Sequence, residues 1–434
     1  MRLQPFTRQR PLTVTPSTAT AARRPTNSLS PPWEGPSLFP PALPPVPISL
    51  TLATVVTPEK LKWHFDDARR RKGDAPGTDG VRLSQVSEAE GWDISREIVD
   101  AIHRGVWQPQ APREFRREKR DGTFRTIEIR DAFTRVVSAT VAEPLSKIVK
   151  RVVPRNVGSV HGGVHQVLLL IQCAFAELGY CAIAADDVKT AFDCVSVADS
   201  LHDFAQHITD PRLLDLIEKI LVGHRSPQSS LIGLAQGDPL SSPATELRLH
   251  TVLDLPEPVG RRVVPLPSRY LDNLFEIGSS VSSVTEALAE DDRRLTQAGL
   301  TLKHTDGPPR DLRESPVDLL GFRVVAAQDQ VKFQLQPNAY DCLRENLEEA
   351  HQRPNPRDSA RNKIHGWISS YGPVWGNADK SQVMSHIRRI ASQTGFTGIL
   401  SNQEVRGLLE RAAQRWAQKS QGVSLAKLLG THWE

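Results

Sequence analysis

Acidic residues stand at the ends of two strand-like stretches that are far apart in the sequence. The apolar run Tyr180–Ala185 leads into Asp186 and Asp187, and Asp272 interrupts a second strand-like stretch, Arg269–Ile277. Aspartate is depleted in strands, so a requirement other than strand propensity keeps these residues there. If the two strands lie side by side, Asp187 and Asp272 would share a pair of Mg²⁺ ions, which prefer oxygen ligands. Two such ions about 3.5–4 Å apart stabilise the attacking and leaving oxygens of phosphoryl transfer. For either aspartate alone, the alternative is a turn-forming residue at a strand end.

A glycine- and proline-rich loop lies between these two stretches. It runs over Gly233–Pro243 and precedes a helix-like segment, Ala244–Leu253. Its small residues allow a backbone to approach a base pair closely, and the amide of Gln236 can hydrogen-bond a template strand or a primer sugar. The order and spacing of the three segments together indicate nucleotide chemistry more strongly than any one of them.

The elements that would position these residues are mixed helices and strands up to about residue 335 and mainly helices beyond it, which predicts an α+β fold. Asp210 followed by Pro211 predicts the N-cap and first position of a helix. Ser401 and Glu404 predict a capping box at the start of an amphipathic helix near the C-terminus. The apolar stripe of that helix is read as core packing.

Composition limits the function classes. The chain has 434 residues and a net charge of +4, and no apolar run approaches the roughly 20 residues of a membrane-spanning helix. Its four cysteines form no C-x-x-C pair, which favours a reducing, cytoplasmic setting and no zinc site. Between Arg113 and Arg155, twelve Lys or Arg stand against six Asp or Glu, either along a phosphate backbone or as a solvated basic face.

Three regions are expected along the chain. Residues 1–57 are rich in Pro, Thr and Arg and are predicted to be a disordered leader, either a flexible tail or a stretch upstream of the true start codon. Residues 58–335 would hold the chemistry, and residues 336–434 would form a helical region.

At these residues the sequence resembles bacterial reverse transcriptases related to group II intron proteins. Their A-D-I-K-x-F-F-D segment is similar to Asp186–Asp193, their G-[IV]-P-Q-G-S-P-L-S-P loop to Gly233–Pro243, and their Y-A-D-D hairpin to Tyr270–Asn273. Further segments that resemble the family, in its order between about residues 60 and 375, are Lys72–Val81, Lys119–Arg125, Arg135, Leu320–Phe322 and Gly366–Gly372.

The resemblance implies an RNA-directed DNA polymerase shaped as a right hand, with an antiparallel-sheet palm, fingers and a helical thumb. It implies that Asp187 and Asp272 bind two Mg²⁺ ions, which Mn²⁺ could replace, with Asn273 or the Val188 carbonyl completing the set. The expected partners are an RNA template, a DNA primer, deoxynucleoside triphosphates and a cognate structured RNA, with no membrane.

The resemblance also assigns roles to residues outside the acidic pair. Phe192 would stand against the 2'-hydroxyl of the nucleotide and so select deoxynucleotides; the alternative is an ordinary core side chain. Lys119 and Arg125 would hold the triphosphate. The remaining residues expected to contact nucleotide, template or primer are Gln236, Gly237, Tyr270 and Gly321.

Three positions depart from the family pattern. Asn273 stands where most relatives have a second aspartate, and an amide keeps an oxygen ligand but lacks the charge, so metal affinity and rate should fall. Asp306 stands where the family has a lysine, so Lys303 or His304 would have to act as proton donor to pyrophosphate. Ser159–His165 also lacks the family's G-F-R, which puts a template or nucleotide contact there in doubt.

These departures leave two rival readings open. One is a polymerase-like protein that binds RNA in intron splicing or in an antiviral defence complex, with synthesis weakened or lost. The other is a non-templated or RNA-making polymerase. Leu319–Gly321 differs from the V-T-G of retron enzymes, and no cysteine follows Cys342, which disfavours a retron and a Cys/His nuclease domain.

Overall fold

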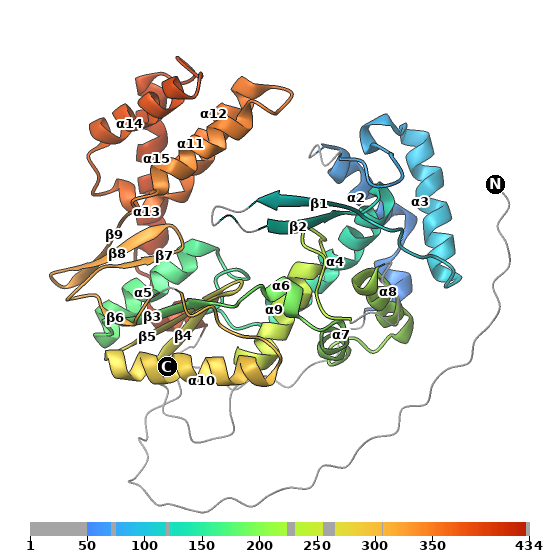
Figure 1. Cartoon of the computed structure of the whole chain (residues 1–434), viewed down its shortest axis with the longest axis horizontal. Coiled ribbons are helices and arrows are strands. Elements are labelled where there is room, and N and C mark those ends of the chain that lie inside the picture. The colour runs from blue at the N-terminus through green and yellow to red at the C-terminus, as the bar shows by residue number, and fades with distance from the viewer. Residues whose placement is uncertain are drawn as a thin grey trace, which may run out of the picture. The chain divides into compact units, whose positions relative to one another are not determined.

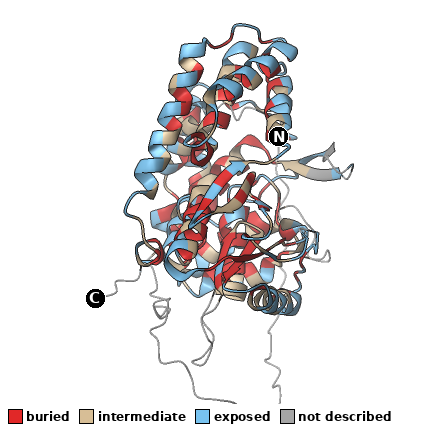
Figure 2. Ribbon diagram, turned by 90° about the vertical axis from the view of Figure 1, so that its left-hand side faces the viewer, coloured by how far each residue is buried: buried red, intermediate tan, exposed pale blue. Residues whose placement is uncertain are grey.

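The computed structural model of the chain describes residues 50–70, 75–118, 122, 124–223, 231–254, 265–305 and 307–430. It combines helices with antiparallel sheets, so the α+β prediction is confirmed (Figure 1). Figure 2 shows buried segments concentrated in the strands and on the inner faces of the helices. None of the helices in these ranges is both long and apolar enough to cross a membrane.

The first part of the described chain is helical except for one hairpin. The hairpin pairs its two strands antiparallel, with Arg113 opposite Ile129. Asp131 caps the long helix that follows, because its Oδ1 accepts hydrogen bonds from the backbone N–H groups of Phe133 and Thr134 at 3.0 and 2.8 Å. The elements are α1 (Leu52–Val55), α2 (Pro58–Arg70), η1 (Leu83–Gln85), α3 (Glu88–His103), β1 (Arg113–Glu118), β2 (Phe124–Ile129) and α4 (Ala132–Val152).

A four-stranded antiparallel sheet in the order β4-β5-β3-β6 forms the centre of the described region. Its strands are β3 (Ala182–Asp187), β4 (Leu266–Tyr270), β5 (Asn273–Gly278) and β6 (Arg310–Asp311). Helix α5 (Val164–Leu178) contacts β4, and α10 (Val281–Gln297) contacts β3 and β5. Figure 1 shows these two helices on opposite faces of the sheet.

Alternation along β3 decides which acidic residue lies on which face of this sheet. Ile183 and Ala185 pack into the core that includes α5, whereas Ala182 and Ala184 pack with Val284 of α10. Side chains alternate between faces along a strand. Asp187 therefore belongs to the α5 side of the sheet, and Asp186 to the α10 side.

The chain between β3 and β4 is mainly helical, and the Gly233–Pro243 loop lies between α8 and α9 and enters the first turn of α9. The helices are α6 (Ala191–Cys194), α7 (Val197–Ala205), α8 (Pro211–Val222), α9 (Ser241–Leu249) and a π-helical turn, η2 (His250–Asp254). Asp210 caps α8 and Pro211 occupies its first turn, so that predicted helix start is confirmed.

The last strands form a separate sheet, and helices alone follow them in the described residues. The strands are β7 (Val317–Leu319), β8 (Phe322–Ala327) and β9 (Gln330–Leu335). The helices are α11 (Ala339–Ala350), α12 (Pro356–Ser370), α13 (Gly372–Trp375), α14 (Lys380–Gln393), α15 (Asn402–Ser420) and α16 (Leu425–Leu429). The Ser401–Glu404 capping box opens α15 as predicted.

The aromatic side chains of this last part pack together. Trp375 is fully buried, and its Nε1 donates to the Ile368 carbonyl at 2.7 Å. The ring of Tyr371 lies 5.1 Å from that of Phe322, so helix α12 and strand β8 are joined at their ends.

The expected leader has an ordered end. Thr51 caps α1 with a capping box, and Leu52 and Val55 are buried in the core. The backbone N–H of Leu52 donates to Asp210 Oδ2 at 2.7 Å, which ties α1 to the start of α8. The described structure therefore begins within the stretch 1–57, and residues 1–49 lie outside it.

Candidate active site

The β4–β5 hairpin turns at Leu271–Asp272 and places this turn beside the end of β3. Leu271 adopts a left-handed backbone conformation, with φ of 55°, which closes the tight turn. In the sheet register Asp187 lies directly opposite Asn273. The Val188 N–H donates to the Asp272 carbonyl at 2.8 Å. The structure thus brings together Asp187 and Asp272, which are far apart in the sequence.

The two carboxyl groups influence each other electrostatically. Burial, and after it the negative charge of Asp187, raise the pKa of Asp272 to about 6. Lys303 forms an ion pair with Asp187 Oδ2, and the Lys303 side chain is 38% exposed. The other oxygen, Asp187 Oδ1, is buried and has no hydrogen-bond partner among the described residues. A buried oxygen in this state leaves a coordination position for a cation.

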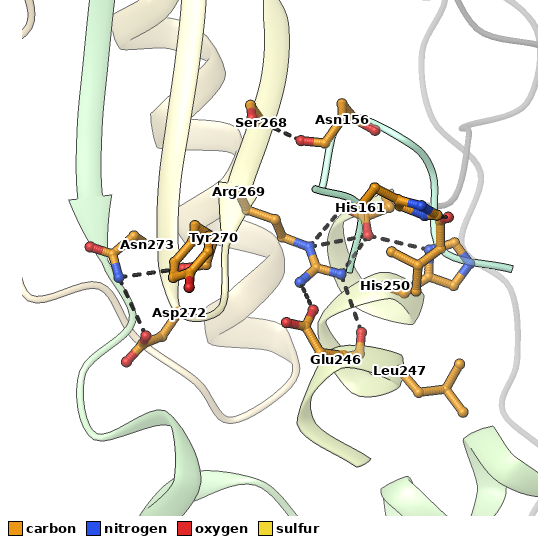
Figure 3. A network of polar contacts seen from close by, with 12 residues as sticks. Asn156, His161, Glu246, Leu247, His250, Ser268, Arg269, Tyr270, Asp272 and Asn273 are labelled. Carbon is orange, nitrogen blue, oxygen red and sulfur yellow. Dashed lines mark hydrogen bonds and ion pairs between the residues drawn. The ribbon is translucent and has the colours of Figure 1, made fainter. Parts of the chain in front are cut away.

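Asn273 and Tyr270 flank the turn (Figure 3). Asn273 Nδ2 lies 3.4 Å from both the Tyr270 carbonyl and Asp272 Oδ1, and its amide oxygen points away from Asp272. The ring of Tyr270 is half-buried against the core. In this arrangement the amide nitrogen of Asn273, rather than its oxygen, faces the Asp272 carboxylate.

These donors suit a hard divalent cation only in part. Two carboxylates, one of which has an oxygen without a hydrogen-bond partner among the described residues, fit the oxygen preference of Mg²⁺ or Mn²⁺. No group of three or more His, Cys, Asp or Glu side chains is arranged to hold a metal within the part of the chain that the structure describes. Asp187 and Asp272 are therefore the protein carboxylates that such an ion would find here.

The loop Gly233–Pro243 is attached to the segment that carries Phe192. The Leu234 N–H donates to the Phe192 carbonyl at 2.6 Å, and Gln236 Nε2 donates to Asp193 Oδ1 at 3.3 Å. Gly237 is exposed, has a φ of 98°, and a Cβ there would meet nothing within 4 Å. The structure thus places Phe192, Gln236 and Gly237 in one connected unit, with the Phe192 side chain packed partly against the core.

Asp238 anchors this loop from beneath, a role that the sequence did not reveal. Its Oδ1 accepts hydrogen bonds from Ser138 Oγ at 2.5 Å and from the Leu240 N–H at 2.9 Å. Its Oδ2 forms a buried ion pair with Arg130 Nε at 3.2 Å. These contacts fix the loop to helix α4. The feature of the sequence that could have indicated this role is an acidic residue inside a loop of small and apolar residues.

Arg269 connects the hairpin to helix α9 and the turn that follows it (Figure 3). The side chain is 2% exposed and forms ion pairs with Glu246 Oε2 and, at 2.8 Å, with Asp254 Oδ2. Burial pushes the pKa of Asp254 upward, but Arg269 and His250 together hold it below its ordinary value. The Arg269 carbonyl also accepts from the Gly158 N–H at 2.8 Å. The sequence did not predict this network of ion pairs. An arginine within a strand-like stretch was the one local feature that could have indicated it.

The expected triphosphate-binding residues are described in part. Arg125 lies on β2 opposite Arg117, and the structure does not describe its side chain; Lys119 lies outside the described residues. Arg135 lies on α4 and donates to the Ala75 carbonyl at 2.7 Å. It therefore holds Ala75, in the described part of the Lys72–Val81 segment, near the start of that helix.

Gly321 lies in the turn between β7 and β8. Its φ is 88°, and a Cβ there would lie 3.1 Å from the hydroxyl of Tyr371. The Leu320–Phe322 and Gly366–Gly372 segments, both singled out in the sequence, therefore contact each other. Gly321 belongs to a different sheet from Asp187 and Asp272.

The two histidines of the segment Ser159–His165 form hydrogen bonds with backbone carbonyls of neighbouring elements. His161 Nε2 donates to the Val153 carbonyl at 2.8 Å, and His165 Nε2 donates to the Ser370 carbonyl at 2.9 Å. Of the two residues considered for the proton-donor role, Lys303 is paired with Asp187, and the backbone N–H of His304 donates to Asp186. Asp306, which stands where the family has a lysine, lies outside the described residues.

Comparisons of the chain with protein-family models and with curated proteins give no match.

Proposed function

We propose that this protein is an RNA-directed DNA polymerase, which extends a DNA primer on an RNA template. The observation that carries the proposal is the meeting of Asp187 and Asp272 where β3 ends and the β4–β5 hairpin turns, at one end of two adjacent inner strands of an antiparallel sheet. Carboxylates that share a site and cannot easily both be ionised are typical of functional sites, and a divalent cation bound between them would relieve their repulsion. A second observation supports the same proposal. The Gly233–Pro243 loop, which resembles a loop of the reverse transcriptases, is hydrogen-bonded to Phe192 and Asp193, which follow Asp187 in the chain.

In this proposal Asp187 and Asp272 hold Mg²⁺ or Mn²⁺. When bound, two such ions stabilise the attacking and leaving oxygens of nucleotidyl transfer. The chain's own residues orient the substrates: Phe192 stands against the sugar, and Gln236 and Gly237 lie where a template or primer can approach. Gly237 suits this role because its Cβ position is open. The expected hand architecture corresponds to the β4-β5-β3-β6 sheet as palm, the β1–β2 region as fingers and the helices after Leu335 as thumb.

The test is primer extension with purified full-length protein, an RNA template, a DNA primer, deoxynucleotides and Mg²⁺ or Mn²⁺. Wild type should extend the primer, and Asp187→Ala should lose this activity. Asp318→Ala is the matched control, because Asp318 is a strand aspartate that forms an exposed ion pair with Arg323 at 2.8 Å. Equal extension by wild type and Asp187→Ala would refute the assignment of the active site.

A second candidate is a polymerase-like RNA-binding protein with weakened or lost synthesis. Two observations favour it: Asn273 turns its amide nitrogen toward Asp272, and Lys303 occupies one oxygen of Asp187. Under this candidate, wild type binds structured RNA with the same affinity as Asp187→Ala and extends no primer in either metal. Filter binding beside the extension assay separates the two functions.

A further inference from the structure

The chain after α10 returns to the end of β3 and pairs with it. Leu302 forms an antiparallel bridge with Val188, and the Lys189 N–H donates to the Thr301 carbonyl at 2.8 Å. The Lys303 N–H donates to the Asp187 carbonyl at 2.9 Å. The backbone around Lys303 is thereby held against the residue whose carboxylate it neutralises.

Asp186 fixes the next residue of this segment. Its side chain is buried on the α10 side of β3, and its two oxygens accept from the His304 N–H at 3.2 and 3.0 Å. Oδ1 also accepts from the Asp187 N–H at 2.8 Å. His304 has a φ of 55°, a conformation that non-glycine residues adopt rarely and that needs support from its surroundings. Asp186 supplies that support, so it acts as a positioning residue for Lys303.

The ion pair between Lys303 and Asp187 has a consequence for cation binding. Asp187 Oδ2 is occupied by the ammonium group, while Oδ1 has no hydrogen-bond partner among the described residues. A divalent cation bound to this carboxylate would lie close to the positive charge of Lys303. Like charges at such distances repel, and the repulsion is strong where the carboxylate is largely shielded from water.

We propose that Lys303 is a built-in counter-ion that competes with the divalent cation for Asp187, so that it sets the cation concentration at which the site fills. The inference rests on the proposed function, because it takes Asp187 and Asp272 as the cation-binding carboxylates. Filling the site requires the ammonium group to move off Oδ2. The lysine has room to do so, since more than a third of its side chain is exposed.

The experiment measures Mn²⁺ binding to the full-length protein by electron paramagnetic resonance, with no nucleic acid or nucleotide present. Lys303→Met removes the charge and keeps the length of the side chain. It should tighten Mn²⁺ binding about fivefold, the effect expected when a partly exposed ion pair at the strong end of the usual range no longer competes. Lys303→Arg keeps the charge and should stay within about twofold of wild type. Lys332→Met, at an exposed position on β9, is the control for loss of a distant lysine.

Two results distinguish failure of this inference from failure of the proposed function. If Mn²⁺ binds wild type and is lost in Asp187→Asn, but Lys303→Met binds no more tightly than wild type, the counter-ion proposal is wrong and the cation site stands. If neither wild type nor Lys303→Met shows Mn²⁺ binding that depends on Asp187, both are wrong. Thermal unfolding of each variant in EDTA verifies that the proteins compared are folded.

Discussion

Replacing Asp272 by asparagine should stabilise the metal-free protein at neutral pH. The pKa of Asp272 is about 6 in the folded protein, against an ordinary value of 3.8. The folded state therefore binds the proton more tightly than the unfolded state does. The contribution of Asp272 to stability is therefore greatest below about pH 4 and is lost as the pH rises through about 6. A shift of about two pKa units corresponds to about 3 kcal/mol at most, and partial exposure of the side chain to solvent reduces this to about 1–2 kcal/mol.

The assay is urea unfolding of wild type and Asp272→Asn in EDTA at several pH values between about 4.5 and 8. The advantage of the variant should grow as the pH rises and then level off. Mg²⁺ or Mn²⁺ should recover part of the stability of the wild type above pH 6, because a ligand that binds only the folded state stabilises it. Asp318→Asn, which removes an exposed pair, should show no such growing advantage. A variant that is equally stable or less stable than wild type at pH 8 would refute the close approach of the two carboxylates.

Three further predictions concern residues around this pair. Asp186→Ala removes the acceptor of two backbone N–H groups and should lower the free energy of unfolding by about 1–3 kcal/mol in urea titrations; an unchanged midpoint would contradict the positioning role. Phe192→Ala should raise ribonucleotide over deoxynucleotide incorporation about tenfold in single-nucleotide extension, and an unchanged ratio would identify Phe192 as a core residue only. Arg269→Leu leaves the buried Glu246 carboxylate without its ion-pair partner and Asp254 with His250 alone. It should cost about 3–5 kcal/mol by thermal unfolding, whereas Arg293→Leu, at an exposed pair, should cost less than about 1 kcal/mol.

Local signals predicted the elements that carry the candidate site. The apolar run before Asp187 became β3, and the stretch around Asp272 became a hairpin whose turn contains that residue. Helix starts at Asp210 and Ser401 were also predictable, since a cap and its neighbours lie within four residues of each other. These features depend on short-range chemistry that the sequence displays directly.

Contacts between segments far apart in the chain could not be predicted from the sequence in the same way. Arg269 meets partners that lie 23 and 15 residues earlier in the chain, and only the folded arrangement of β4 with α9 explains why an arginine belongs in that strand. Asp186 looked like a substitution for alanine, although strand alternation already separates its face from that of Asp187. The ordered helix at Leu52–Val55 was hidden because the composition of a long leader outweighed one capping residue, Thr51.

The buried arginine at position 269 gives the molecule a mechanical property. Arg269 joins strand β4 of the hairpin to helix α9, which follows the loop that contains Gln236. Its guanidinium group forms ion pairs with Glu246 and with Asp254, so these elements form one unit. A domain movement that opened or closed around a substrate would carry this unit as a single piece. Any hinge must then bend elsewhere in the chain, and the amide hydrogens of β4 and α9 should show similar opening free energies in hydrogen exchange.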